Sequence, residues 1–184
     1  MAITRAKTSS VAQGPSTKKT LLGGNDVILG GSYDAIGTAT VGSGGQSTIS
    51  FSSIPATYKH LQVRMSTNSG GNIRFNGDTT SSNYRYHVVY GSGTAAVATT
   101  AANNAYSPAD ASGSTGWTGE VLDILDYANT SKNKVTRSLG GWDNNGSGVV
   151  WLSSNLWMST AAINQIVFTG TFPQYSSFAL YGIK

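Results

Sequence analysis

The stretch ISFSSIPATYKHLQVRMST, residues 49–67, sets the fold that we expect for the whole chain. Apolar side chains occupy alternate positions on both sides of a proline, and they are Ile49, Phe51, Leu61, Val63 and Met65. Alternation with a period of two is typical of strands that bury one face and leave the other in water. Pro55 has no backbone N–H to donate, so it interrupts the ladder between the two runs. The stretch predicts two core strands joined as a hairpin through a proline elbow.

Strand-like runs continue on both sides of this stretch. They cover residues 36–41, 72–75, 84–90, 95–99, 117–127, 135–142, 148–158, 163–169 and 176–183. The sequence SGGQ at residues 43–46 suits a hairpin between residues 36–41 and 47–51. No run has the period of a helix, and turn-forming sequences separate the runs. We therefore expect an all-β fold, an antiparallel jelly-roll-like β-sandwich over residues 34–184.

Residues 1–33 differ in composition, and we expect them to form an extended N-terminal arm before this body. The segment mixes Ser, Thr, Gly and Lys and has no strand or helix period. Such a segment buries too little apolar surface to fold alone. We favour an arm held by other chains over one folded back on its own body. Two short apolar clusters would be its attachment points, namely Leu21, Leu22, Val27, Ile28 and Leu29.

The composition limits the kinds of partner and chemistry. Charged residues make up 11% of the chain, against roughly 25% in an average soluble domain. The arm's four basic residues are scattered and have no aromatic neighbours, so we expect no nucleic-acid partner. The chain has no cysteine, which excludes disulfides and thiol chemistry. Its longest uninterrupted apolar run, residues 149–152, is too short to cross a membrane, and we expect no membrane partner.

No residue pattern indicates an enzyme, a metal site or a cofactor. We expect His60 and His87 to be structural. Glu120 and Asp126 share a strand face but lie about 20 Å apart at roughly 3.3 Å per residue, whereas a glycosidase pair needs about 5–10 Å. Asp78, Asp110 or Asp143 could approach them in the folded chain. More simply, Asp123 and Asp126 would pair with basic residues of the neighbouring strand, which are Lys132, Lys134 and Arg137.

Two further features have more than one interpretation. Residues 143–148, DNNGSG, place oxygen ligands as a calcium loop does, but Ser154 stands where that loop needs a glutamate, so we favour a hairpin turn. Tyr106 and Trp142 are the aromatic residues that we most expect to be exposed. Exposed rings of this kind suit a subunit interface, where Tyr and Trp are enriched, and they also suit stacking on a sugar ring. We favour the interface, and we keep the glycan as the alternative.

Four segments carry a resemblance to a known group of proteins: ISFSSIPATYKHLQVR, IRFNGDTTSSNYRYH, VLDILDYANTSKNKVTRSLGGWDNNGSG and the terminal FALYGIK. Together they resemble a small domain that recurs in structural proteins of tailed bacteriophages. The opening RAKTSSVAQGP, with LLGGND after it, is also similar to the start of such proteins. The similarity covers most of the chain except residues 92–115. It involves structural motifs and carries over no active-site residue.

The resemblance implies a virion protein of the fibre, tail or head-surface type, made in the host bacterial cytoplasm. We therefore expect a non-enzymatic structural protein that attaches to capsid or tail proteins through its arm. Its further partners would be copies of itself, because a symmetric particle presents equivalent neighbouring sites. The alternative is a tail-fibre module that binds a host-surface glycan receptor.

Overall fold

The computed structural model describes the chain over residues 18–20, 26–28, 32–102, 116–143 and 145–184. Near the N-terminus, β1 (Lys18–Thr20) pairs with β2 (Asp26–Ile28) in an antiparallel two-stranded sheet of their own. Within the described ranges the helical structure is one turn, η1 (Ser81–Asn83), between β6 and β7. No helix in these ranges is long and apolar enough to cross a membrane.

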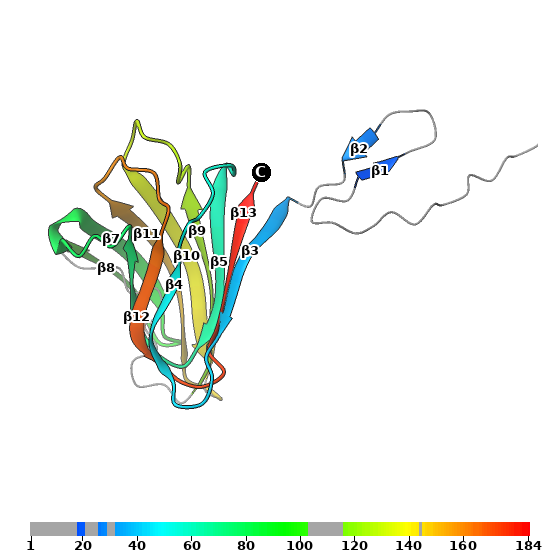
Figure 1. Cartoon of the computed structure of the whole chain (residues 1–184). Coiled ribbons are helices and arrows are strands. Elements are labelled where there is room, and N and C mark those ends of the chain that lie inside the picture. Colours follow the sequence, from blue (N-terminus) through cyan, green and yellow to red (C-terminus); the bar gives the residue numbers. More distant parts are fainter. Residues whose placement is uncertain (1–17, 21–25, 29–31, 103–115, 144) are drawn as a thin grey trace, which may run out of the picture.

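The body consists of two antiparallel sheets that face each other (Figure 1). The large sheet has eight strands, in the order β3 (Tyr33–Thr40), β13 (Ser177–Ile183), β5 (His60–Thr67), β9 (Thr118–Leu125), β10 (Lys134–Asp143), β11 (Gly148–Trp157), β7 (Tyr84–Gly91) and β8 (Ala96–Ala102). The small sheet has three, in the order β4 (Gln46–Phe51), β12 (Ile166–Phe172) and β6 (Gly71–Phe75). The predicted antiparallel β-sandwich is confirmed, and its body begins at Tyr33, one residue earlier than expected.

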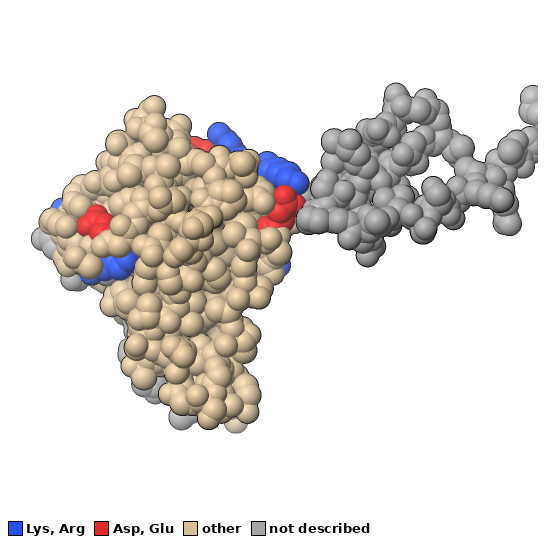
Figure 2. All heavy atoms as spheres, viewed as in Figure 1, with Lys and Arg blue, Asp and Glu red and all other residues tan. Residues whose placement is uncertain are grey.

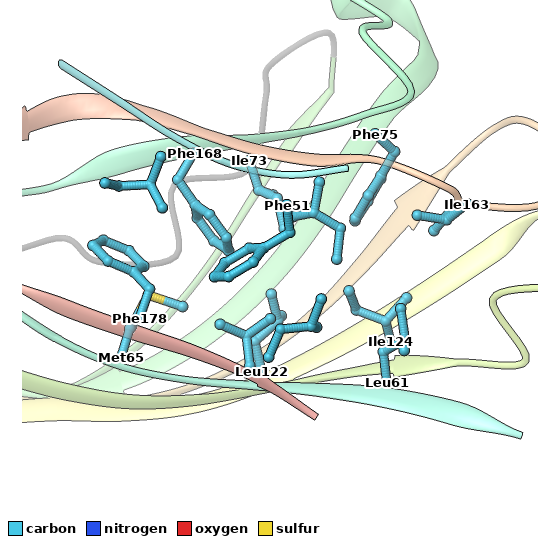
Figure 3. Close-up of a cluster of buried hydrophobic side chains, with 14 of the residues drawn as sticks. Phe51, Leu61, Met65, Ile73, Phe75, Leu122, Ile124, Ile163, Phe168 and Phe178 are labelled. Atoms are coloured by element: carbon cyan, nitrogen blue, oxygen red, sulfur yellow. The ribbon is translucent and has the colours of Figure 1, made fainter. Parts of the chain in front are cut away.

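The hydrophobic core fills the space between the two sheets (Figure 3). The small sheet contributes Phe51, Ile73, Phe75 and Phe168, and β5, β9 and β13 of the large sheet contribute Leu61, Met65, Leu122, Ile124 and Phe178. The rings of Phe168 and Phe178 meet across the core with centroids 5.2 Å apart. The period of two in these strands places one apolar side chain in every two on the core face.

The stretch at residues 49–67 forms two core strands, but the predicted hairpin is wrong. The five apolar side chains expected in the core are all buried. However, β4 pairs with β12, whereas β5 pairs with β13 and β9, so residues 52–59 carry the chain from one sheet to the other. The backbone N–H of Ile54 donates to the carbonyl of Asn164 at 3.0 Å, and the hydroxyl of Tyr127 donates to the carbonyl of Pro55. Both β4 and β5 bury their apolar side chains in the same core, because they belong to opposite sheets that face each other across it.

Of two further predicted hairpin turns, one carries the chain between the sheets and the other joins paired strands. The hairpin predicted between residues 36–41 and 47–51 is wrong, because β3 pairs with β13 and β4 pairs with β12. The chain crosses from the large sheet to the small sheet through Gly44 and Gly45, whose φ angles are +94° and +73°. The predicted hairpin at residues 143–148 is confirmed, since β10 pairs with β11 from Asp143–Gly148 onward. Asn145 and Gly146 in this turn have φ values of 49° and 101°, which Asn and Gly adopt most readily.

Candidate interaction surface

In β10 and β11, several polar residues lie on the buried face and several aliphatic residues lie on the exposed face. On the inner face of β10, Thr136 and Ser138 are buried, while Val135 and Leu139 point outward and are exposed. In β11, Ser153 and Asn155 are likewise buried, and Val150 and Leu152 are exposed. A strand with one wet face normally shows the reverse arrangement. The outer surface of these two strands is therefore rich in aliphatic side chains.

The buried polar side chains hydrogen-bond to one another, although Asn155 Oδ1 has no partner among the described residues. The hydroxyls of Ser138 and Ser153 lie 2.8 Å apart in a cross-strand hydrogen bond. The side-chain amide of Asn155 donates to Thr136 Oγ1 and to Ser153 Oγ, both at 3.1 Å. Buried polar groups are tolerated when they form such a connected network. The network fixes which face of each strand points inward, because a shift of one residue would reverse every side chain.

Five outward aliphatic residues lie close together on neighbouring strands and form a patch, which we call the outer apolar face: Val89, Val121, Leu139, Val150 and Leu152. At its centre, Leu139 lies opposite Val121 on one side and Leu152 on the other, and Leu152 lies opposite Val89. Leu139 and Val150 are each 58% exposed, and Leu152 and Val89 are each 47% exposed. Single exposed aliphatics are ordinary on a protein surface, but contiguous patches mark interaction sites.

A shallow hollow of about 450 Å³ lies within this face, over β10, β11, β7 and β8. Its floor includes Val89 and Leu152, and His87, Thr100 and Arg137 line it together with Ser154. These four polar residues belong to one row across the sheet, because Arg137 pairs with Ser154, Ser154 with His87, and His87 with Thr100. The hollow thus includes part of the aliphatic patch and the row of polar residues beside it, which we call the polar band, and one partner can contact both.

The polar band continues toward the other edge of the sheet. Asp123 lies opposite Arg137 and accepts a hydrogen bond of 2.8 Å from the side-chain amide of Gln62. The oxygen of that amide accepts a hydrogen bond of 2.9 Å from Arg64 Nε. The guanidinium of Arg64 lies over the rings of Tyr33 and Tyr181, 5.2 and 5.1 Å from their centroids. These contacts hold the long side chains at this end in defined positions.

The opposite side of the sandwich has a different chemical character. Figure 2 shows it in the view of Figure 1, with β4 and β12 toward the reader, and Lys, Arg, Asp and Glu are confined to the margins of the body. The exposed residues of β4 include Thr48 and Ser50. This side carries short polar groups, whereas the outer apolar face lies on the large sheet.

The carboxylates of β9 and the turn after it do not converge. Glu120 is buried on the inner face, Asp123 lies on the outer face, and Asp126 lies in the turn that follows the strand. Lys59 Nζ lies 3.0 Å from Asp126 Oδ1, and Lys132 Nζ contacts Asp126 Oδ2, so the expected pairing of Asp126 with Lys132 is confirmed. Hydrogen bonds from Lys132 and Lys59 lower the pKa of Asp126 from 3.8 to about 2. Among the described residues, no three His, Cys, Asp or Glu side chains are placed to hold a metal ion.

The other expected ion pairs are wrong. Asp123 is bonded to Gln62, and Lys134 is fully buried, with Nζ donating to the carbonyls of Lys132 and Thr160 at 3.0 Å each. Burial lowers the pKa of Lys134. The inward orientation of this strand end could not be seen in the sequence, where a lysine on a strand is normally an outward residue.

The structure places one of the two histidines and some of the predicted site residues in positions that differ from those expected. His60 Nδ1 accepts the backbone N–H of Asp126 at 3.0 Å, as a structural histidine does, whereas His87 is exposed in the hollow. Trp142 lies on β10 opposite Val149 and is half-buried rather than exposed, and its indole N–H has no hydrogen-bond partner among the described residues. Val27 and Ile28 lie on β2. The remaining predicted site residues lie outside the described residues: Leu21, Leu22, Leu29 and Tyr106.

The outer apolar face was not predicted, although the sequence contains a signal for it. In VTRSL, residues 135–139, and in VWLSSN, residues 150–155, one alternating set contains aliphatics and the other contains Ser, Thr or Asn. That pattern predicts the aliphatic set to be buried. The structure buries the hydroxyl set and leaves the aliphatic set exposed. Comparisons with protein families, with curated proteins and with solved structures find no match.

Proposed function

We propose that the chain is a non-enzymatic structural protein of a bacteriophage virion. In this role the sandwich is displayed or packed on the particle, and the N-terminal arm attaches it to capsid or tail proteins. The observation that carries the proposal is the outer apolar face, which suits contact with protein and presents no cluster of reactive groups. The resemblance of four sequence segments to tailed-phage structural proteins supports the same role.

The division of the chain into arm and body supports an attachment role for the arm. The strands β1 and β2 pair with each other and join neither sheet of the body. The sandwich has its own core between its two sheets. The described residues of the arm contribute no strand to the body, which supports the attachment of the arm to another protein.

Deleting residues 1–31 tests the proposal in the phage that carries this protein. The deletion stops before Tyr33, the first residue of β3, so it should leave a folded body. We expect that body to be absent from purified particles, as measured by mass spectrometry or immunoblotting of the virion. A point variant refines the test: Val27→Asp with Ile28→Asp should reduce incorporation, whereas Lys18→Ser with Lys19→Ser should not. Normal incorporation of the deleted chain would contradict the attachment model.

A further inference from the structure

We propose that the outer apolar face is a self-association interface, on which a second copy of this chain packs sheet against sheet. The inference deepens the proposed structural role, in which copies associate, and rests on it for its biological meaning. Its evidence and its test concern the purified protein alone. A failure of this interface can therefore be distinguished from a failure of particle attachment.

The inverted strands provide the first argument. Leu139 and Leu152 lie side by side at the centre of the large sheet and are about half exposed, while Ser138 and Ser153 beside them are buried. Exposed aliphatic area is unfavourable in water in proportion to its size. Edge or loop residues can be exposed by chance, but these residues occupy the interior strands of an eight-stranded sheet. A second apolar layer outside the sheet would bury them, as sheets pack face to face in sandwiches.

The size of the face provides the second argument. The outer apolar face lies on four strands, β9, β10, β11 and β7, and β5 and β8 flank these strands in the same sheet. At about 4.8 Å between strands and about 3.4 Å per residue, six strands of eight residues cover about 780 Å². A stable protein–protein interface buries about 800 Å² on each partner. The outer apolar face together with its two flanking strands is thus large enough for a stable dimer.

The third argument is that the face is complementary to itself. A twofold axis parallel to the strands, between β10 and β11, would place β10 of one copy over β11 of the other, and β9 over β7. The strand register then sets Leu139 of one copy opposite Leu152 of the other, and Val121 opposite Val89. An isologous interface requires this kind of two-way match.

The charged residues of the face fit the same symmetry. The twofold axis places Asp123 of one copy opposite His87 of the other, and Arg137 opposite Ser154. No two like charges stand directly opposite each other in this row, and the two Arg137 side chains lie one strand spacing apart across the axis. A foreign partner would need its own complementary arrangement of aliphatic and charged rows, whereas a second copy supplies it without further assumption.

Sedimentation velocity of the full chain over a wide concentration range tests the interface. We expect a reversible dimer, and we expect Leu139→Asp with Leu152→Asp to weaken it by at least about a hundredfold, because each charge would be buried against aliphatic groups. The matched control, Thr48→Asp with Ser50→Asp on the exposed face of β4, should leave association unchanged. Circular dichroism checks that both double variants fold.

Cross-linking tests the symmetry without disturbing the aliphatic centre. The chain contains no cysteine, so an introduced one is the only thiol. Val89→Cys and Val121→Cys chains, mixed and treated with a short bismaleimide, should give cross-linked dimers. The proposed symmetry sets position 89 of one copy opposite position 121 of the other, whereas the two positions of one copy are three strand spacings, about 14 Å, apart. A Ser50→Cys chain should give none. A full chain that stays monomeric, or a dimer that survives both aspartates, would overturn the proposal, as would binding only to a different protein.

Discussion

Asp78 is the residue that fastens the two sheets at one end of the sandwich. It follows the Asn76–Gly77 turn at the end of β6, in the small sheet. Its Oδ2 accepts hydrogen bonds from Trp157 Nε1, on β11 of the large sheet, and from the side-chain amide of Asn83, both at 2.8 Å. Its Oδ1 accepts the backbone N–H of Thr80 at 2.8 Å, which closes the turn. One carboxylate thus links a turn, a helical turn and both sheets.

These contacts predict a specific effect of pH on stability. Desolvation opposes ionisation of Asp78, but the hydrogen bonds from Trp157, Asn83 and Thr80 outweigh it and lower its pKa from 3.8 to about 2. A carboxylate whose pKa is lower in the folded state stabilises the fold above its unfolded pKa, and this stabilisation is lost as pH falls through the folded pKa. The free energy of unfolding should therefore fall between about pH 4 and pH 2.

Asp78→Asn isolates this contribution. Asparagine keeps one acceptor oxygen but loses the charge, so we expect unfolding free energy near neutral pH to fall by about 1–3 kcal/mol. The wild-type and variant curves, measured by urea denaturation, should converge toward pH 2. The turn carboxylate Asp126 titrates in the same window in both proteins, so it does not affect the difference. As a control, Asp34→Ala removes an exposed ion pair with Lys184 and should cost under about 1 kcal/mol. If the unfolding free energies of Asp78→Asn and wild type change in parallel with pH, the stabilising role of the Asp78 carboxylate is contradicted.

The sequence predicts the positions of the strands much better than it predicts which strands pair with each other. The alternation of Ile49 and Phe51, and of Leu61 and Val63, identifies both strands and their buried faces. It does not say which strands they pair with, because a period of two gives the face of a strand and not its partner. Paired strands are far apart in the chain here, as when β4 pairs with β12 and β3 with β13. The β10–β11 hairpin was correctly predicted because its Asn145–Gly146 turn is a local signal, and β9 also pairs with β10 as expected.

The candidate surface escaped the sequence analysis for a related physical reason. Alternation assigns the aliphatic set of β10 and β11 to the core, but the buried bonds among Thr136, Ser138, Ser153 and Asn155 hold the other set inside. Those bonds join two strands and form only after the strands pair in register. A single strand's sequence therefore cannot reveal which set is buried.

The crossover between β4 and β5 should depend on the hydroxyl of Tyr127. This side chain is fully buried, and its hydroxyl donates to the carbonyl of Pro55 and accepts the N–H of Tyr58 at 3.4 Å. Tyr127→Phe keeps the ring but leaves that carbonyl without its donor, so we expect a loss of about 1–3 kcal/mol in urea denaturation. Tyr175→Phe is the control, because its ring is 70% exposed. Equal stability of the two variants would show that the hydroxyl does not hold the crossover.

The whole molecule presents two chemically different sides, and this sets how it would sit in an assembly. The exposed face of β4 carries Thr48 and Ser50, and the visible side in Figure 2 is almost free of charge. The large sheet presents the outer apolar face. A copy that packs through the large sheet leaves the hydroxyl-bearing side toward solvent. Because charged residues are 11% of the chain, apolar contact rather than ion pairing should dominate its association.

If copies associate through the body, thermal stability should depend on protein concentration, and this dependence distinguishes contacts of the body from contacts of the arm. A second copy that binds only the folded chain raises the thermal midpoint as concentration rises, because each tenfold increase stabilises the folded dimer by about 1.4 kcal/mol. Calorimetry should show this rise for the full chain and no rise for Leu139→Asp with Leu152→Asp. Deletion of residues 1–31 should preserve both the midpoint and its rise, because β1 and β2 join neither sheet. If the deleted chain melts lower at every concentration, the arm packs on its own body, and its apolar clusters are then engaged there rather than with another protein.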